Sequence, residues 1–264
     1  MGGSLYAQVA VPPTAPLIAP PAAADPIAPI APAPVLGGTE GRQVSWLRLP
    51  ANLVSDQKRI WTFPPKVVRK RWVWPTVAVV AVTAALIATD AHTAPHFRNT
   101  NVFHGFNSVF TSNATDTGMI VAPATLYAAG LVARNSYARK TALLAGEAAA
   151  DAEIVTVLAK DIDRRARPAS FAPNTSMAGS WFNGQGSWIR GNGSFPSGHT
   201  IAAFSIATVI ARRYPNQRWV KYAAYGIAAA VGFSRLTLSA HFPSDVFVGG
   251  VLGYSISRFA VLGQ

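Results

Sequence analysis

Three short segments of the chain contain residue types that suit the binding and transfer of a phosphoryl group. They read "KDIDRRARP", "PSGH" and "SRLTLSAHFPSD". Together they supply three cations, two histidines and a carboxylate: Lys160, Arg167, Arg235, His199, His241 and Asp245. Guanidinium and ammonium groups can neutralise the charge on the oxygens of a transferring phosphoryl group where no metal does so. The residue set therefore predicts a metal-independent oxyanion site.

The second segment sits at the predicted start of a helix. Ser197 precedes the apolar run "TIAAFSIATVIAR" and is typical of an N-cap residue. The amides of Gly198 and His199 would then open the helix, whose positive dipole end favours an anion. Glycine at position 198 also lets the backbone approach that anion closely. We therefore expect Ser197 and Gly198 to bind a phosphate beside His199.

The third segment separates the roles of the two histidines. Pro243 pre-sets a first helical turn that can bring Asp245 within reach of His241. A carboxylate on one ring nitrogen fixes the tautomer and leaves the other nitrogen free to attack. We predict that His241 is the nucleophile that forms a phosphohistidine, that Asp245 orients it, and that His199 is the general acid and then the base. The remaining expected phosphate ligands are Lys160, Arg167 and Arg235.

Other charged residues receive plainer interpretations. Arg164, Arg165 and Arg190 match no position in these patterns, so we interpret them as surface or substrate-steering charges. Three further histidines lie outside the segments: His92, His96 and His104. Pro95 interrupts the spacing of the first two, and Asp90 is their one convincing acidic neighbour. We therefore expect neither a metal nor a cofactor.

Apolar segments predict the elements that position these residues. Residues 72–89 run without a charge and are just long enough to cross a bilayer core as a helix. Each chemical segment lies where an apolar helix begins or ends, so antiparallel neighbours would gather all three at one end of a bundle. Glycines near the C-terminus would let helices approach closely: Gly226, Gly232, Gly249, Gly250 and Gly253. We expect an all-α, membrane-embedded bundle of about six helices, centred on residues 72–89, 117–133, 141–159, 200–211, 222–234 and 246–257.

The charge distribution favours a membrane over nucleic acid. The chain has 264 residues, 50% of them hydrophobic, and a formal charge of +12 that would suit nucleic acid, anionic lipid or a phosphorylated substrate. The cations form short clusters between apolar segments: Lys66, Arg69, Lys70 and Arg71; Arg134, Arg139 and Lys140; Arg212, Arg213, Arg218 and Lys221. Cytoplasmic loops of membrane proteins are enriched in such residues. If the cation clusters lie on the cytoplasmic side, the three chemical segments lie on the extracytoplasmic face.

The N-terminal residues 1–45 predict a disordered leader, because proline and alanine dominate the run "VPPTAPLIAPPAAADPIAPIAPAP". The opening "MGGSLYAQ" lacks the charged and apolar regions of a complete signal peptide, although it would fit the stub of one that starts upstream. Cysteine is absent, so disulfide usage does not indicate a compartment. The catalytic bundle is expected over residues 70–264.

The three segments, in this order and at these spacings, resemble the tripartite signature of the type 2 phosphatidic acid phosphatase (PAP2) superfamily. That superfamily also contains bacterial class A acid phosphatases, glucose-6-phosphatase and vanadium haloperoxidases. The resemblance covers roughly residues 70–262 and implies a helical bundle with a metal-independent phosphatase site. It implies the family's roles for the residues at the matching positions: Lys160, Arg167, Ser197, Gly198, His199, Arg235, His241 and Asp245.

We therefore expect an integral phosphatase of the inner cell membrane, with its active site on the extracytoplasmic face. Its expected substrate is a phosphate monoester or diphosphate of a lipid, such as phosphatidate or a polyprenyl diphosphate. The alternatives are a soluble, non-specific periplasmic acid phosphatase that acts on small molecules, a vanadium-dependent haloperoxidase, and a non-catalytic binder of phospholipid headgroups.

Overall fold

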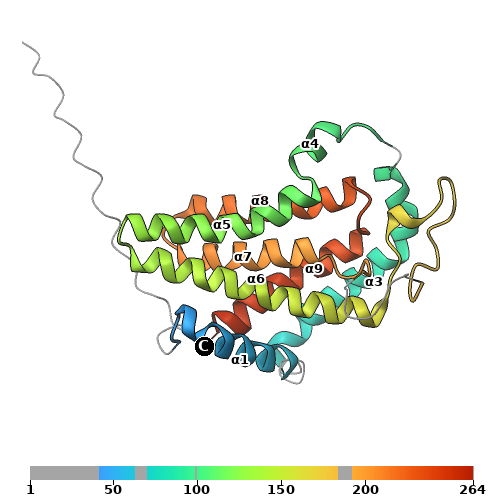
Figure 1. The fold of residues 1–264 in the computed structure, drawn as a ribbon. Coiled ribbons are helices and arrows are strands. Elements are labelled where there is room, and N and C mark those ends of the chain that lie inside the picture. Colours follow the sequence, from blue (N-terminus) through green and yellow to red (C-terminus); the bar gives the residue numbers. More distant parts are fainter. Residues whose placement is uncertain (1–41, 63–69, 99, 184–191, 264) are drawn as a thin grey trace, which may run out of the picture. The chain divides into compact units, whose positions relative to one another are not determined.

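The computed structural model describes four stretches of the chain: residues 42–62, 70–98, 100–183 and 192–263. Every regular element in these stretches is helical and none is a strand, so the predicted all-α fold is confirmed (Figure 1). Some predictions fall outside the described residues: most of the leader at 1–45, Lys66, Arg69, Arg190, and the side chains of Lys70 and Arg71.

The six expected helices are all present. Four of them extend beyond both ends of the apolar run that predicted them, whereas α5 and α9 begin earlier than their runs and also end earlier. They are α3 (Lys70–Arg98), α5 (Ser112–Val132), α6 (Ser136–Asp163), α7 (Gly198–Arg213), α8 (Arg218–Thr237) and α9 (Pro243–Ser255). The described residues also form elements that the sequence did not predict: α1 (Leu49–Thr62), α4 (His104–Val109), the 3-10 turns η1 (Trp46–Arg48) and η2 (Pro168–Ser170), and a π-helical turn η3 (Ile256–Val261).

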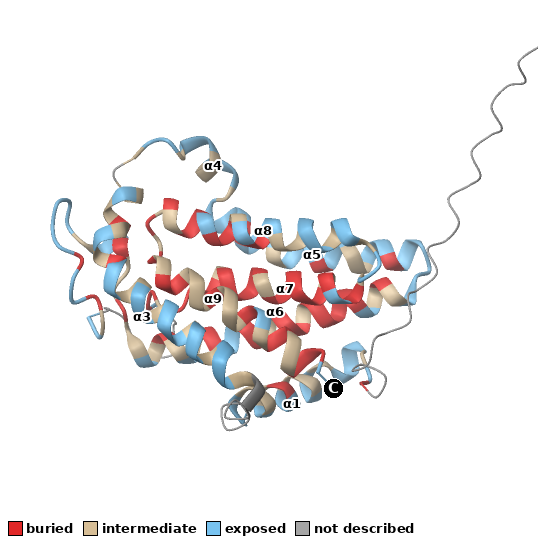
Figure 2. Ribbon diagram, turned by 180° about the vertical axis from the view of Figure 1, so that it is seen from behind, coloured by how far each residue is buried: buried red, intermediate tan, exposed pale blue. Residues whose placement is uncertain are grey.

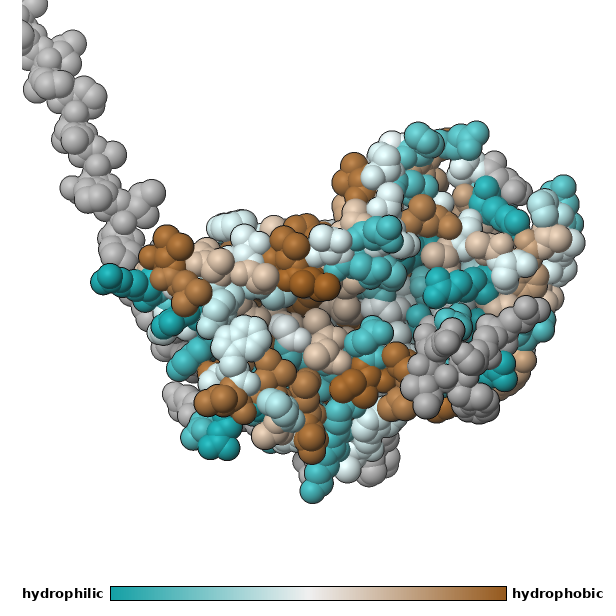
Figure 3. All heavy atoms as spheres, viewed as in Figure 1, coloured by the Kyte–Doolittle hydropathy of each residue, from teal (hydrophilic) through white to brown (hydrophobic). Residues whose placement is uncertain are grey.

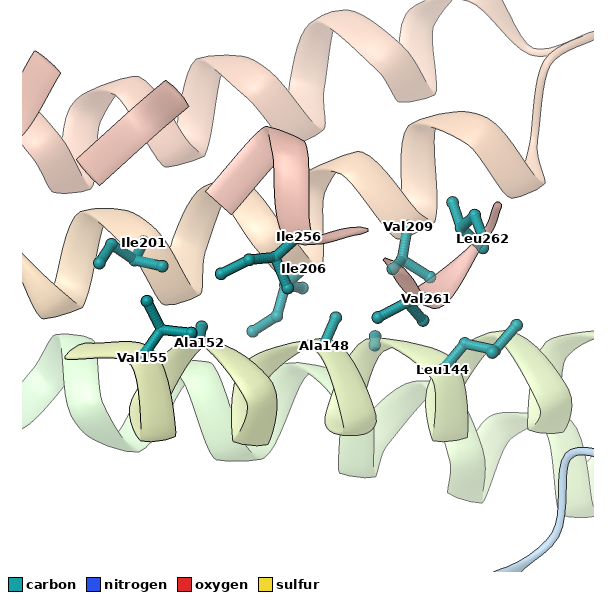
Figure 4. Close-up of a cluster of buried hydrophobic side chains, with 11 residues drawn as sticks. Leu144, Ala148, Ala152, Val155, Ile201, Ile206, Val209, Ile256, Val261 and Leu262 are labelled. Atoms are coloured by element: carbon teal, nitrogen blue, oxygen red, sulfur yellow. The ribbon is translucent and has the colours of Figure 1, made fainter. Parts of the chain in front are cut away.

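Helix α7 is the centre of the bundle. It packs against α5, α6, α8 and α9, and most of its residues are buried (Figure 2). The main core lies between α6, α7 and η3, where apolar side chains of all three interdigitate (Figure 4). Ala148 and Ala152 keep the α6 surface shallow, so that Ile201 and Val209 of α7 are fully buried there. This packing fixes where α7 begins, which matters for the site.

Two glycines let α9 lie directly on α7. A Cβ atom at Gly249 would lie 2.9 Å from the carbonyl oxygen of Ser197, and a Cβ at Gly253 would overlap the carbonyl oxygen of Ile201. The predicted close approach is therefore confirmed at these two positions. It does not hold at Gly226, where a Cβ would meet nothing within 4 Å.

Helix α1 turns its polar side toward the bundle. Arg42 Nη2 donates to Asp56 Oδ2 and to Glu147 Oε2 of α6, each at 2.6 Å, and Asn52 donates to Glu147 Oε1 at 2.8 Å. Ile60 packs against the main core, whereas four other large apolar side chains of this region are exposed: Trp46, Leu47, Val54 and Trp61. Arg42 belongs to the predicted leader, yet it is buried against α6.

One described helix is long and apolar enough to cross a membrane: residues 72–98 of α3, whose most apolar stretch contains no buried residue. Large apolar side chains are also exposed on the neighbouring helices, including Ile120, Val121, Leu131, Ile227 and Phe233. Figure 3 shows hydrophobic patches along the sides of the bundle, with more hydrophilic side chains toward the end where α6 finishes. The lateral surface is therefore suited to an apolar environment.

The predicted cation clusters of the α5–α6 and α7–α8 turns lie at one end of the bundle, as both ribbon views show (Figures 1 and 2). The end of α6, the start of α7 and the α8–α9 connection lie at the other. One member of the clusters differs from expectation. Arg213 is buried, donates from Nε to Thr141 Oγ1 at 3.1 Å and lies over the ring of Tyr137.

Candidate active site

Backbone hydrogen bonds join the three chemical segments at one end of the bundle. The amide of Ser194 donates to the carbonyl of Arg165 at 2.7 Å, which ties the loop before α7 to the segment after α6. The amide of Ser197 donates to the carbonyl of Asp245 at 3.1 Å, which ties the start of α7 to the first turn of α9. Segments that are far apart in sequence therefore meet where the sequence predicted.

The first segment spans the end of α6 and the loop that follows it. Lys160 lies in the last turn of α6 and is buried, but α6 ends at Asp163 because Arg164 adopts a left-handed conformation with φ of 44°. Pro168 lies five residues beyond this end and begins η2. Arg167 is the N-cap of that turn and comes from a loop.

The second segment begins α7 against α6. Ser197 is the N-cap residue, as predicted, but its hydroxyl accepts from Thr200 Oγ1 at 2.8 Å and makes no capping bond. A Cβ at Gly198 would lie 2.8 Å from Thr156 Cγ2 and 3.7 Å from Lys160 Nζ. Gly198 therefore lets α7 approach α6, and this places the Lys160 ammonium beside the N-terminus of α7.

The third segment forms a buried histidine–aspartate pair. Pro243 is the first residue of α9, and Asp245 Oδ2 lies 3.4 Å from His241 Nδ1. The same oxygen accepts from Ser194 Oγ at 2.5 Å and from the Phe242 amide at 2.8 Å. These donors hold the carboxylate on the Nδ1 side of the ring, so Nε2 is the nitrogen left for a substrate.

The surroundings of His241 favour its neutral form. Burial lowers the pKa of His241 from 6.5 to about 4, although the hydrogen bond and charge of Asp245 act in the opposite direction. The positive charges of Lys160 and Arg167 lower the pKa further. A neutral imidazole retains the lone pair that a nucleophile requires, so the environment suits attack near neutral pH.

The cations act on both imidazoles. The charge of Lys160 interacts with His199 as well as with His241, and Arg235 interacts with His199. Arg167 interacts electrostatically with His241, Lys160 and Arg235. The two histidines therefore face one cationic cluster, which is the arrangement that an anionic substrate between them would need.

Arg235 is held by the start of α5. Its Nη2 donates to the carbonyl of Phe110 at 2.6 Å, and its Nη1 donates to Ser112 Oγ at 3.1 Å. The amide of His241 donates to the carbonyl of Arg235 at 3.2 Å, so the backbones of these two residues are held close together. The guanidinium is therefore pre-positioned before any substrate arrives.

His199 has an acidic neighbour that the sequence did not predict. Its Nε2 lies 3.0 Å from Asp116 Oδ1, and the side chain of Asp116 is 60% exposed. Asp116 comes from α5, outside the three chemical segments, so no spacing within them could have identified it.

Arg165 corrects a prediction directly. We expected a surface or steering charge, but the side chain is buried and contacts two carboxylates: Nη1 lies 2.6 Å from Asp245 Oδ1 and Nη2 lies 2.7 Å from Asp90 Oδ2. Its guanidinium lies between the rings of Trp181 and Phe242, at 4.4 and 4.0 Å from their centroids. This residue therefore belongs to the interior of the site.

The donor groups of the described residues do not suggest a metal centre. No set of three or more histidine, aspartate or glutamate side chains among them is placed to hold an ion. His92 and His96 are exposed on α3, and Asp90, which the sequence offered as their acidic partner, is buried and bonded to Arg165.

Comparisons with known proteins found three similarities. The model of the PAP2 superfamily matches residues 141–264. A segment of 65 residues, 24% of this chain, is 40% identical to the lipid A 1-phosphatase of Porphyromonas gingivalis and spans 15% of that relative's length. A solved structure, the first transmembrane PAP2 type phosphatidylglycerolphosphate phosphatase from Bacillus subtilis, is similar with a TM-score of 0.42 and 21% identity, over 79% of this chain and 94% of that one.

Proposed function

We propose that the chain is a metal-independent phosphatase of a lipid phosphate, and the match of the PAP2 superfamily model to residues 141–264 supports this. The observation that carries the proposal is the buried His241–Asp245 pair beside Lys160 and Arg167. A neutral imidazole, oriented by a carboxylate and surrounded by cations, is suited to attack phosphorus within an anionic group.

The proposed reaction has two steps. In the first, His241 Nε2 attacks phosphorus, the bond from phosphorus to the leaving oxygen breaks, and His199 gives that oxygen a proton. In the second, His199 takes a proton from water, the water oxygen attacks phosphorus, and the bond to Nε2 breaks to release inorganic phosphate. Asp245 holds the Nδ1 proton throughout and stabilises the charge on the ring.

The phosphate ligands in this proposal come from each segment. Lys160, Arg167 and Arg235 neutralise the equatorial oxygens, and the amides at Gly198 and His199 add the positive end of α7. The Ser197 hydroxyl contributes as a further polar group at the same position. Because the Ser197 side chain makes no capping hydrogen bond, it leaves the first amides of α7 free of a side-chain cap.

A lipid substrate is supported by the lateral surface. Helix α3 is long and apolar enough to span a bilayer, and exposed apolar side chains continue over α5 and α8. The similarity to a lipid A 1-phosphatase supports the same substrate class. We place the protein in the inner membrane with the site on the extracytoplasmic face, because the cation clusters of the α5–α6 and α7–α8 turns lie at the opposite end.

Phosphate release tests this proposal. The purified chain, in detergent and with EDTA, is offered phosphatidate, a polyprenyl diphosphate, lipid A and a sugar phosphate. We expect release from at least one lipid, and we expect His241→Ala to lose at least about a thousandfold in kcat. His92→Ala is the matched control, because His92 is an exposed histidine on α3.

Three results would contradict the proposal. Abundant activity in His241→Ala would show that His241 is not the nucleophile. Activity that requires an added divalent metal would contradict the metal-independent mechanism. A preference for the sugar phosphate over every lipid would favour a non-specific acid phosphatase instead. Quenching during turnover with an alkaline denaturant, in which the phosphorus–nitrogen bond is stable, should also trap a phosphohistidine in the wild type and not in His241→Ala.

A further inference from the structure

Arg165 lies outside the residues to which the proposed mechanism assigns a role, yet it is among the most completely buried large side chains of the described chain. A buried guanidinium is costly unless its donors are satisfied. Here Nε donates to Ser180 Oγ at 3.1 Å, and Nη1 also donates to Ser244 Oγ at 2.8 Å, in addition to its two carboxylate partners. These two hydroxyls and two carboxylates form a polar cage around the Arg165 guanidinium.

The first carboxylate in the cage belongs to the nucleophile's partner. Asp245 divides its oxygens: Oδ1 accepts from Arg165, while Oδ2 faces His241 Nδ1 and accepts from Ser194 and Phe242. The bond to Arg165 therefore decides which oxygen the imidazole meets and how the carboxylate plane is turned. A change of this bond would be transmitted to the ring through Asp245.

The second carboxylate comes from the candidate membrane span. Asp90 of α3 accepts from Arg165 Nη2 through Oδ2, accepts from the Ser244 amide at 3.1 Å through Oδ1, and also bonds the Ser244 hydroxyl. It is buried, and Ser244 precedes Asp245 in the first turn of α9. Asp90 thus braces both the guanidinium and the helix turn that carries Asp245.

We propose that Asp90 and Arg165 are positioning residues that act through Asp245 on the nucleophile, so that α3 is a structural part of the active site. The inference rests on the proposed function. The order of contacts runs from Asp90 to Arg165, to Asp245 and to His241. The charges explain why Arg165 is needed: without it, the carboxylates of Asp90 and Asp245 would repel each other around Ser244 with no cation between them.

The test compares kcat, KM and the inhibition constant for vanadate, which reports the phosphate cradle. We expect Arg165→Met to lower kcat by about a hundredfold, because misplacement of a reacting group costs that much, and Asp90→Asn to lower it less. KM and vanadate inhibition should change little, since the expected phosphate ligands are other residues. Arg165→Lys should recover only part of the loss, because an ammonium cannot bridge two carboxylates as a guanidinium does.

A second background separates positioning from general support of the fold. In an Asp245→Asn chain, Asp90→Asn should cost almost nothing further, because the residue through which it acts is already lost. Independent losses that multiply in the double variant would overturn the inference. The matched controls are Arg218→Met and Glu153→Gln, which remove the same charges from exposed positions.

The outcomes distinguish this inference from the proposed function. If the wild type releases no phosphate, the proposed function fails. If the wild type is active and His241→Ala is not, the function stands, and wild-type kcat in Arg165→Met or Asp90→Asn overturns the inference alone. Should Arg165→Met fail to fold, Asp90→Asn and Arg165→Lys decide, because both keep the size and much of the polarity of the native side chain.

Discussion

His241, the proposed nucleophile, is buried among cations, and these surroundings set the pH range in which it would attack. The residue must be neutral, and burial with the nearby charges lowers its pKa to about 4, so protonation removes the nucleophile only below that value. Burial and the charge of Arg235 lower the pKa of His199, the proposed general acid, to about 4 as well, so His199 must take up its proton when the anionic substrate binds. We expect kcat/KM, corrected for the ionisation of the substrate, to hold down to about pH 5 and to fall as the pH drops through about 4.

The measurement is the acid limb of the kcat/KM profile, since that parameter reports groups of the free enzyme. An acid limb with its midpoint at 6.5, the ordinary value for histidine, would contradict the environment described for His241. Lys160→Met serves as a comparison, because removal of that positive charge should move the midpoint upward, toward the ordinary value.

The sequence predicted site residues that act within a local pattern and missed those that act across it. His241 and Asp245 are four positions apart, so one helical turn brings them together, and spacing alone predicts that. Arg165, Asp90 and Asp116 meet the site only through tertiary packing. The signal that could have identified Arg165 is weak: it lies between Lys160 and Arg167 of the first segment, where three of four consecutive residues are arginine.

The contact between α7 and α9 depends on a glycine in a way that a substitution can measure. At Gly253 a Cβ would overlap the Ile201 carbonyl and lie 2.9 Å from Phe204 Cβ, so α9 must move away from α7. Overpacking of this kind costs about 1–3 kcal/mol. We expect Gly253→Ala to lower the unfolding temperature in detergent, and to lower kcat as well, because α9 carries Asp245.

Gly226→Ala is the matched control for that change. It lies on α8, where a Cβ would meet nothing within 4 Å, and alanine is the better helix former by up to about 1 kcal/mol. We therefore expect equal or higher stability and unchanged kcat. Equal destabilisation by both substitutions would show that the helix approach seen at Gly253 does not decide the packing.

At the level of elements, apolar periodicity predicted the long helices because their apolar faces are continuous and their ends are marked by charges. The pattern did not predict α1. The side of α1 that faces the bundle combines Ile60, which packs against the main core, with the buried charge of Asp56, while Val54 and Trp61 are exposed. The partners that make this arrangement favourable, Arg42 and Glu147, are remote in sequence, so no local window contains the explanation.

For the molecule as a whole, the different charges at the two ends of the bundle predict how it is oriented in a membrane. The α7–α8 turn, with its cations, lies at one end, and the loop after α6 lies with the candidate site at the other (Figure 1). Since cytoplasmic loops are enriched in lysine and arginine, the two ends should face opposite sides of the membrane. The absence of cysteine makes this directly measurable, because one introduced thiol is the only one in the chain.

Two exposed loop residues serve as the reporters: Ala172 at the site end and Asn216 in the α7–α8 turn. A membrane-impermeant maleimide should label Ala172→Cys in spheroplasts, and it should label Asn216→Cys only after lysis. The reverse labelling pattern would place the site on the cytoplasmic side and would exclude extracytoplasmic lipid phosphates as substrates. Recovery of the chain in the supernatant, with both positions labelled before lysis, would instead identify a soluble periplasmic enzyme, in which the exposed apolar face of α3 would need another partner.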